Sequence, residues 1–78
     1  MKTGQRLKMM RERLGLTYTD VAGYVGVNRT TIMRYEKGET SKMPISLIVP
    51  LSEVLKCSPT YLMGWTNDPN DYPKNQKE

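Results

Sequence analysis

Histidine and phenylalanine are absent from this sequence of 78 residues, and cysteine occurs once. With no histidine and no closely spaced cysteines or carboxylates, the chain lacks a recognisable set of metal ligands, so we expect no metal and no cofactor. The single cysteine, Cys57, excludes an intramolecular disulfide and indicates a reducing compartment. No apolar run approaches the roughly 18 to 20 residues of a membrane span, and no signal-peptide core is present. We therefore expect a soluble intracellular protein with no membrane partner.

The chain also lacks the length and the grouped reactive residues that catalysis needs. A domain of 78 residues lies near the lower limit at which one core is self-sufficient, which leaves little room for a catalytic cleft. No nucleophile, base and orienting group occur together, so we expect neither an enzyme nor a small-molecule substrate. Positive charge is concentrated: residues 1–42 have nine Lys and Arg against four Asp and Glu, whereas residues 43–78 have three against four. The basic half favours a nucleic-acid partner.

Residues 17–38 have the pattern of two short helices joined by a turn. Thr17 and Asp20, three residues apart, resemble a capping box at the start of the first helix. An apolar stripe at helical spacing follows, made by Val21, Ala22 and Val25. Ala22 is small enough to let a second helix cross closely. Gly26 is expected to end the first helix, because glycine adopts a left-handed backbone conformation without strain.

The second helix of this pair is expected to begin after Asn28 and to end at Gly38. The side-chain oxygen of Asn28 is predicted to accept hydrogen bonds from the free amides of the first turn. Ile32 and Tyr35 then face the core. The outer face carries Arg29, Thr30, Met33, Arg34 and Lys37. Arginine donates two hydrogen bonds to guanine, and threonine offers a hydroxyl and a methyl group, so this face suits the major groove of DNA.

Two more helical segments flank this pair. The first is predicted over residues 4–14, with an inner stripe formed by Leu7, Met10, Arg11 and Leu14. A helical pattern over residues 44–56 contains Pro50 near its middle. Proline removes one helical hydrogen bond, so either the helix kinks or it begins at Pro50, with residues 44–49 as a separate turn.

The last helix is expected to begin at Pro59, with Ser58 as its N-cap and Gly64 at its C-cap. Residues 66–78 are polar and contain two prolines, the composition of a flexible tail or linker. We therefore expect one folded domain over residues 1–65.

Four motifs in combination resemble the Cro/C1-type helix-turn-helix family, the lambda-repressor-like domains. They are Leu-Gly-Leu-Thr before the second helix, Val-Asn-Arg-Thr-Thr-Ile at the third, Tyr-Glu-Lys-Gly at its end, and Cys-Ser-Pro-Thr-Tyr-Leu-Met-Gly in the fifth. The resemblance covers residues 4–64 and is strongest to the N-terminal domain of a phage repressor. It implies an all-α, compact bundle of about five short helices, with the helix-turn-helix formed by helices 2 and 3. A phage or prophage repressor in the bacterial cytoplasm or nucleoid is the expected class.

The resemblance also implies roles for individual residues. The positions that contact bases in the family fall on Arg29, Thr30 and Arg34. The positions near the DNA backbone fall on Thr17, Tyr18, Asn28, Thr31, Lys37, Thr40, Ser41 and Lys42. Family members often have glutamine in place of Tyr18, whose hydroxyl could reach a phosphate or whose ring could simply pack. Gly23, Pro50 and a slightly long connection over residues 39–43 also depart from the family pattern.

An ion pair and a dimer contact complete the expectations. Arg11 lies on an apolar stripe, where a charge needs a partner, and the resemblance pairs it with Glu36. Tyr61, Met63 and Trp65 suit a dimer contact and equally suit capping of the core. The leading function is therefore double-stranded DNA binding by a transcriptional regulator, as a homodimer on a pseudo-palindromic operator. The alternative is an antitoxin-type protein-interaction module that also binds DNA to regulate itself.

Overall fold

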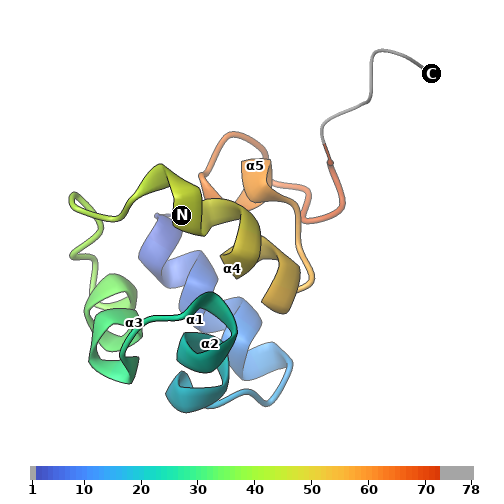
Figure 1. Ribbon diagram of the computed structural model, residues 1–78. Helices are drawn as coiled ribbons and strands as arrows, with labels where there is room; N and C mark the ends of the chain where they lie inside the picture. Colours follow the sequence, from blue (N-terminus) through green and yellow to red (C-terminus); the bar gives the residue numbers. More distant parts are fainter. Residues whose placement is uncertain (1, 73–78) are drawn as a thin grey trace.

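The computed structural model describes residues 2–72, and every regular element in that range is helical. The elements in chain order are α1 (Thr3–Arg13), α2 (Tyr18–Val25), α3 (Arg29–Glu36), the 3-10 turn η1 (Ile45–Leu47), α4 (Ile48–Val54) and α5 (Pro59–Leu62). The expected all-α bundle of five short helices is thus confirmed. In Figure 1, α1 lies behind α2, α3 lies to their left, and α4 and α5 lie above them.

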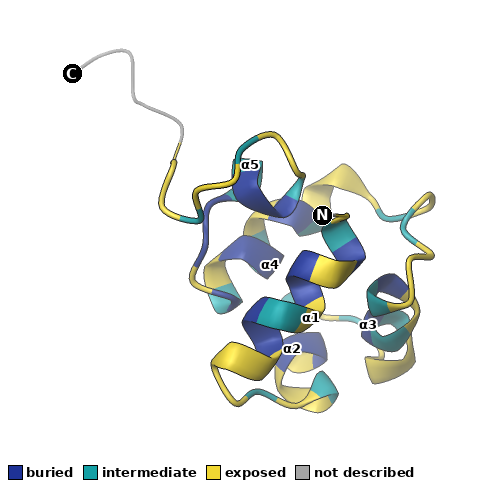
Figure 2. Cartoon of the chain, turned by 180° about the vertical axis from the view of Figure 1, so that it is seen from behind, coloured by how far each residue is buried: buried dark blue, intermediate teal, exposed yellow. Residues whose placement is uncertain are grey.

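The core receives side chains from all five α-helices. Leu7, Val21, Ile32, Leu51 and Leu62 are fully buried, one from each helix in turn. Burial of an aliphatic side chain of this size contributes about 1.5 to 3 kcal/mol, so these residues dominate the stability of so small a domain. Figure 2 shows the buried positions gathered on the inward faces of the helices, with exposed residues on their outer turns.

The turn between α2 and α3 has one feature as predicted and one that differs. Gly26 ends α2 with a left-handed φ of 82°. Asn28 lies at the N-cap of α3, but its side chain makes no capping hydrogen bond, so that prediction was wrong. The amide of Thr31 instead donates to the backbone carbonyl of Asn28 at 3.0 Å. A backbone oxygen thus satisfies this amide, and the side chain of Asn28 is exposed, with no hydrogen-bond partner among residues 2–72.

Pro50 neither kinks a long helix nor begins one. It is the third residue of α4, which starts at Ile48 directly after η1. Amides in the first turn of a helix have no partner within that helix, so the missing N–H of proline costs little here. Pro59 starts α5 as expected, and Ser58 Oγ accepts a hydrogen bond from the amide of Tyr61 at 3.1 Å.

The predicted tail begins too early, because residues 66–72 are tied to the helices. Arg6, only 3% exposed, donates from Nη1 to the carbonyl oxygens of Tyr61 at 2.6 Å and Thr66 at 2.5 Å. Its Nη2 donates to Asn67 Oδ1 at 2.7 Å. The amide of Ser58 also donates to the carbonyl of Pro69 at 2.7 Å. Residues 73–78 of the predicted tail lie outside the described residues.

Gly4 brings the backbones of α1 and α3 into direct contact. A Cβ atom added at Gly4 would lie 2.2 Å from the carbonyl oxygen of Tyr35 and 3.3 Å from that of Glu36. A side chain at this position would therefore push the end of α3 away from α1. Gly23, in the middle of α2, has no neighbouring atom within 4 Å of the corresponding point.

We predict opposite effects of Gly4→Ala and Gly23→Ala on stability. Gly4→Ala should lower the free energy of unfolding by about 1 to 3 kcal/mol, the usual cost of overpacking. Gly23→Ala should raise it by roughly 0.5 to 1 kcal/mol, because alanine is the better helix former where space is open. Urea unfolding of the two variants measures both changes. Equal stability of the two variants would show that α1 and α3 are not in backbone contact at Gly4.

Candidate nucleic-acid interface

The outward face of α3 is a cationic surface on a helix fixed from behind. Ile32 and Tyr35 are 0% and 7% exposed, which sets the rotation of the helix about its axis. The side chains predicted to read bases, Arg29, Thr30 and Arg34, are all exposed. Lys37 is exposed as well, whereas Thr31 and Met33 are half-buried. Because Ile32 and Tyr35 are buried, only one rotation of α3 is possible, and in it both arginines face solvent.

A hollow lies between α3 and the connection that follows it. Its lining includes Thr31 and Arg34 from α3 and Ser41 and Lys42 from the connection. The structure thus brings together predicted backbone-contact residues from two segments. Thr40, the remaining predicted residue of the connection, is half-buried and is not part of this lining. Sequence analysis missed Glu39, which also lines the hollow and places a carboxylate among the cations.

The first turn of α2 is already capped from within. Thr17 Oγ1 accepts from the amide of Asp20 at 3.0 Å, and Asp20 Oδ2 accepts from the amide of Thr17 at 2.9 Å. The hydrogen bond that the backbone amide of Thr17 donates to this carboxylate is the main cause that lowers the pKa of the Asp20 carboxyl group. The backbone amide of Thr17 is therefore not free for a phosphate. Within residues 2–72, the amides of Tyr18 and Thr19 have no hydrogen-bond partner.

Arg11 and Glu36 form a nearly buried, bidentate ion pair between α1 and the last residue of α3. Nε of Arg11 lies 2.5 Å from Oε2 of Glu36, and Nη2 donates to Oε1 at 3.1 Å. Their side chains are 11% and 3% exposed. Donating these hydrogen bonds to Glu36 raises the pKa of Arg11 above its ordinary value, so the guanidinium stays charged. Its Nη1 also donates to the carbonyl of Leu16 at 2.9 Å, ahead of α2.

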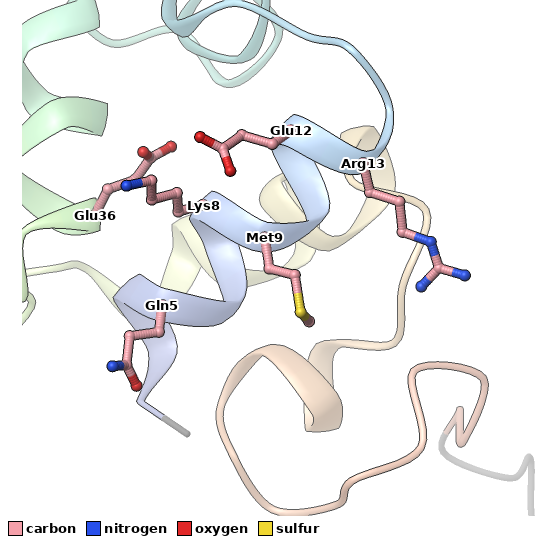
Figure 3. Close-up of a pocket in the computed structure, with 6 residues that line it drawn as sticks. All are labelled: Gln5, Lys8, Met9, Glu12, Arg13 and Glu36. Atoms are coloured by element: carbon pink, nitrogen blue, oxygen red, sulfur yellow. The ribbon is translucent and has the colours of Figure 1, made fainter.

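A shallow hollow lies on the solvent side of this junction. Figure 3 shows Lys8 and Glu12 projecting from α1 on the side facing Glu36, whereas Arg13 points away. Gln5 and Met9 complete the lining. Charges of both signs line this hollow, and one of its lining residues, Glu36, belongs to the ion pair already described. We therefore regard it as the outer edge of that junction and not as a separate site.

The residues predicted to form a dimer contact do not share one environment. Tyr61 is 6% exposed, and its ring lies 4.2 Å from the guanidinium carbon of Arg6. Of the two roles left open for Tyr61, packing in the core is therefore the one that the structure has, and Tyr61 is withdrawn from the dimer contact. Met63 is half-buried, and Trp65 is 75% exposed. Only the last two remain accessible to a partner.

Residues 2–72 contain neither a membrane-spanning helix nor a cluster of metal-binding side chains. No helix in that range is long and apolar enough to cross a membrane. In the same range, no three side chains of the His, Cys, Asp or Glu type come together as a group that could bind a metal ion. Cys57 is fully buried, and burial raises the pKa of its thiol, so it packs as a small apolar residue.

Residues 3–62 match the family model described as "Helix-turn-helix domain". The chain belongs to this helix-turn-helix family. The match spans α1 through α5 and therefore includes the outward cationic surface of α3 and the Arg11–Glu36 ion pair.

Among relatives, the chain is 41% identical over 51 residues to PH1808, an HTH-type protein of Pyrococcus horikoshii. That alignment covers 65% of this chain but 16% of the relative, so the chain spans only a small part of that protein. The P22 c2 repressor of Salmonella phage P22, solved in complex with a synthetic operator, has a TM-score of 0.74 and 28% identity. The alignment covers 81% of this chain and 94% of that one.

The same fold also occurs inside an enzyme. Hydroxypropylphosphonic acid epoxidase from S. wedmorenis aligns with a TM-score of 0.72 and 23% identity, over 78% of this chain and 32% of the epoxidase. An identity this low shows the fold alone. The family members with higher identity described above are an HTH-type protein and a repressor.

The Arg11–Glu36 pair predicts strongly unequal effects of single and double substitutions. Arg11→Met or Glu36→Leu alone should cost about 3 to 5 kcal/mol, because each leaves an uncompensated charge in a nearly buried position. The double variant should recover much of this loss, since both charges are replaced by apolar groups of similar size. Thermal melts of the three variants test this. Single variants that melt within a few degrees of the parent would show that the pair contributes no more than a surface pair does.

The capping box at α2 predicts a stability contribution that depends on pH. Because the folded pKa of Asp20 is lowered, its carboxylate stabilises the fold above the unfolded pKa and loses this effect as pH falls through the folded pKa. We expect Asp20→Ala to be less stable than the parent near neutral pH and to approach it as the solution is acidified. Urea unfolding over a series of pH values measures the difference. A gap that stays constant with pH would exclude a charged cap.

Proposed function

We propose that this chain is a sequence-specific DNA-binding domain of a transcriptional regulator, with α3 lying in the major groove. The single observation that carries the proposal is the exposure of Arg29 and Arg34 on a helix whose opposite face is locked into the core. The likeness to the P22 c2 repressor, solved with a synthetic operator, supports the same interpretation. A repressor is the regulator class that this likeness favours.

Base recognition is assigned to Arg29, Thr30 and Arg34. Arg29 and Thr30 occupy the first turn of α3, the part of a recognition helix that meets base edges. An arginine can donate two parallel hydrogen bonds to O6 and N7 of guanine, a pattern that no other base pair offers in the same place. Thr30 can bond to a base edge or contact the methyl group of thymine.

Backbone contacts are assigned to residues around this face. They are Thr17 through its hydroxyl, Asn28 through its free amide, and Thr31, Lys37, Thr40, Ser41 and Lys42. Such contacts set the register on the duplex and carry little sequence information. Asp20 and Glu39 oppose them, because each places a carboxylate beside a position where a phosphate would approach. We expect these two acidic residues to restrain nonspecific binding.

Two copies acting on a pseudo-palindromic operator are part of the proposal. A single domain of this size makes too few base contacts for typical operator affinity, so paired half-sites about one helical turn apart are expected. Met63 and Trp65 are the residues we assign to the contact between copies. An antitoxin-type interaction module is the alternative, and the exposed arginines of α3 favour DNA over a purely protein partner.

The assignment of the arginines gives a direct test. DNA selected from a random pool by the purified protein should contain two related half-sites. Arg29→Ala and Arg34→Ala should each cost about 1 to 3 kcal/mol at the selected site while sparing most of the affinity for random DNA. Fluorescence anisotropy with both DNAs at one fixed salt concentration measures the two affinities.

Arg13→Ala is the matched control, since Arg13 is an exposed arginine that points away from the ion-pair junction at the end of α1. It should bind the selected site and random DNA each with the affinity of the parent. If Arg29→Ala and Arg34→Ala reduce both affinities by the same factor, the arginines bind phosphate only. If no sequence is enriched at all, the chain is not a sequence-specific DNA-binding domain.

A further inference from the structure

Tyr18, the first residue of α2, stacks on the same guanidinium that bonds to the end of α3. The ring centroid of Tyr18 lies 4.3 Å from the guanidinium carbon of Arg11. The side chain of Tyr18 is partly buried and packs against the core. Arg11 is thus contacted on a face by α2 and on its edges by Glu36 and by the carbonyl of Leu16.

This arrangement restricts the plane of the guanidinium. A bidentate pair forms only when the guanidinium and the carboxylate lie close to a common plane. The carbonyl of Leu16 accepts from one edge of the guanidinium. The ring of Tyr18 covers one of its faces and so opposes tilting of the guanidinium out of the plane that it shares with the carboxylate. The hydroxyl of Tyr18 takes no part, because it has no hydrogen-bond partner within residues 2–72. The contribution of the ring can therefore be tested separately from that of the hydroxyl.

We propose that Tyr18 is a positioning residue for sequence reading: its ring, through Arg11 and Glu36, fixes the orientation of α3 relative to α2. This inference rests on the proposed DNA-binding function for its effect on recognition. Under it, Tyr18 contributes to discrimination between DNA sequences without itself touching a base or a phosphate.

Two substitutions of Tyr18 separate the role of its ring from that of its hydroxyl. Tyr18→Phe keeps the ring and removes the hydroxyl, whereas Tyr18→Leu removes both. Tyr24→Leu is the matched control, because Tyr24 lies on the same helix, is 57% exposed and bonds to Glu53 instead of approaching Arg11. Each protein is compared with the parent at a temperature where its melting curve shows it fully folded.

The first measurement is the ratio of affinities for the selected site and for random DNA. Loss of a cation–π contact should lower this ratio about 3- to 10-fold in Tyr18→Leu. Tyr18→Phe and Tyr24→Leu should keep it within about twofold of the parent, a margin smaller than the loss of that contact produces. Equal loss of both affinities in Tyr18→Phe would overturn the proposal, since it would assign the hydroxyl to a phosphate. An unchanged ratio in Tyr18→Leu would overturn it as well.

The second measurement needs no DNA and so separates this inference from the proposed function. In proton–nitrogen correlation spectra, Tyr18→Leu should shift the Nε–H signal of Arg11 and the backbone amides at the end of α3, including that of Glu36. Tyr18→Phe should preserve these signals, and Tyr24→Leu should leave them in place. Spectra in which Tyr18→Leu changes only residues of α2 would contradict the proposal even if the chain binds DNA. Shifts at Glu36 without any sequence preference would support the coupling and refute the proposed function.

Discussion

The placement of the helix-turn-helix depends on the contacts of one group, the guanidinium of Arg11. It bonds to the last residue of α3 and to the carbonyl before α2, and it stacks on the first residue of α2. Three segments of the chain thus converge on one side chain of α1. Desolvating a charge is costly, so a geometry that satisfies it from all sides is favoured over neighbouring arrangements in which one bond is lost. The pair therefore selects one arrangement of the three helices more than it adds to overall stability.

This selection matters because α3 is too short to define its own position. Helices of about eight residues are marginal in isolation, so their order comes from packing. Ile32 and Tyr35 fix the rotation of α3, Glu36 fixes its far end, and the backbone contact at Gly4 limits how close that end can come to α1. A reading surface of only a few side chains gains specificity when its supporting contacts are rigid. The buried ion pair therefore supports the outward cationic surface of α3 by holding that helix in place.

Local signals in the sequence predicted most of the fold. Thr17 with Asp20, Gly26, and Ser58 with Pro59 each act within a few residues of chain, so their patterns identify the helix ends that the structure has. The outward face of α3 followed from helical spacing alone. Asn28 was assigned a side-chain cap that the backbone makes unnecessary, since the carbonyl of Asn28 itself already accepts the hydrogen bond from the amide of Thr31.

The contacts of Arg6 had no local signal. Its partners lie 55 to 61 residues away and are mostly carbonyl oxygens, which any residue type provides. A charged residue near the start of a surface helix is normally exposed, so its burial follows only from the tertiary fold. The attachment of residues 66–72 was missed for the same reason. For Tyr61 the sequence left a dimer contact and capping of the core equally open, and the cover that Arg6 provides over its ring, which decides between them, lies 55 residues away in sequence.

The central claim is that arginines of α3 read guanine in the major groove. Replacement of single guanines in the selected site by 7-deazaguanine tests it most directly, because this base lacks the N7 acceptor and keeps normal pairing. The account predicts that wild-type binding weakens at particular guanines and that Arg29→Ala or Arg34→Ala is insensitive to one of those same replacements. Unchanged wild-type binding at every replaced guanine would contradict it.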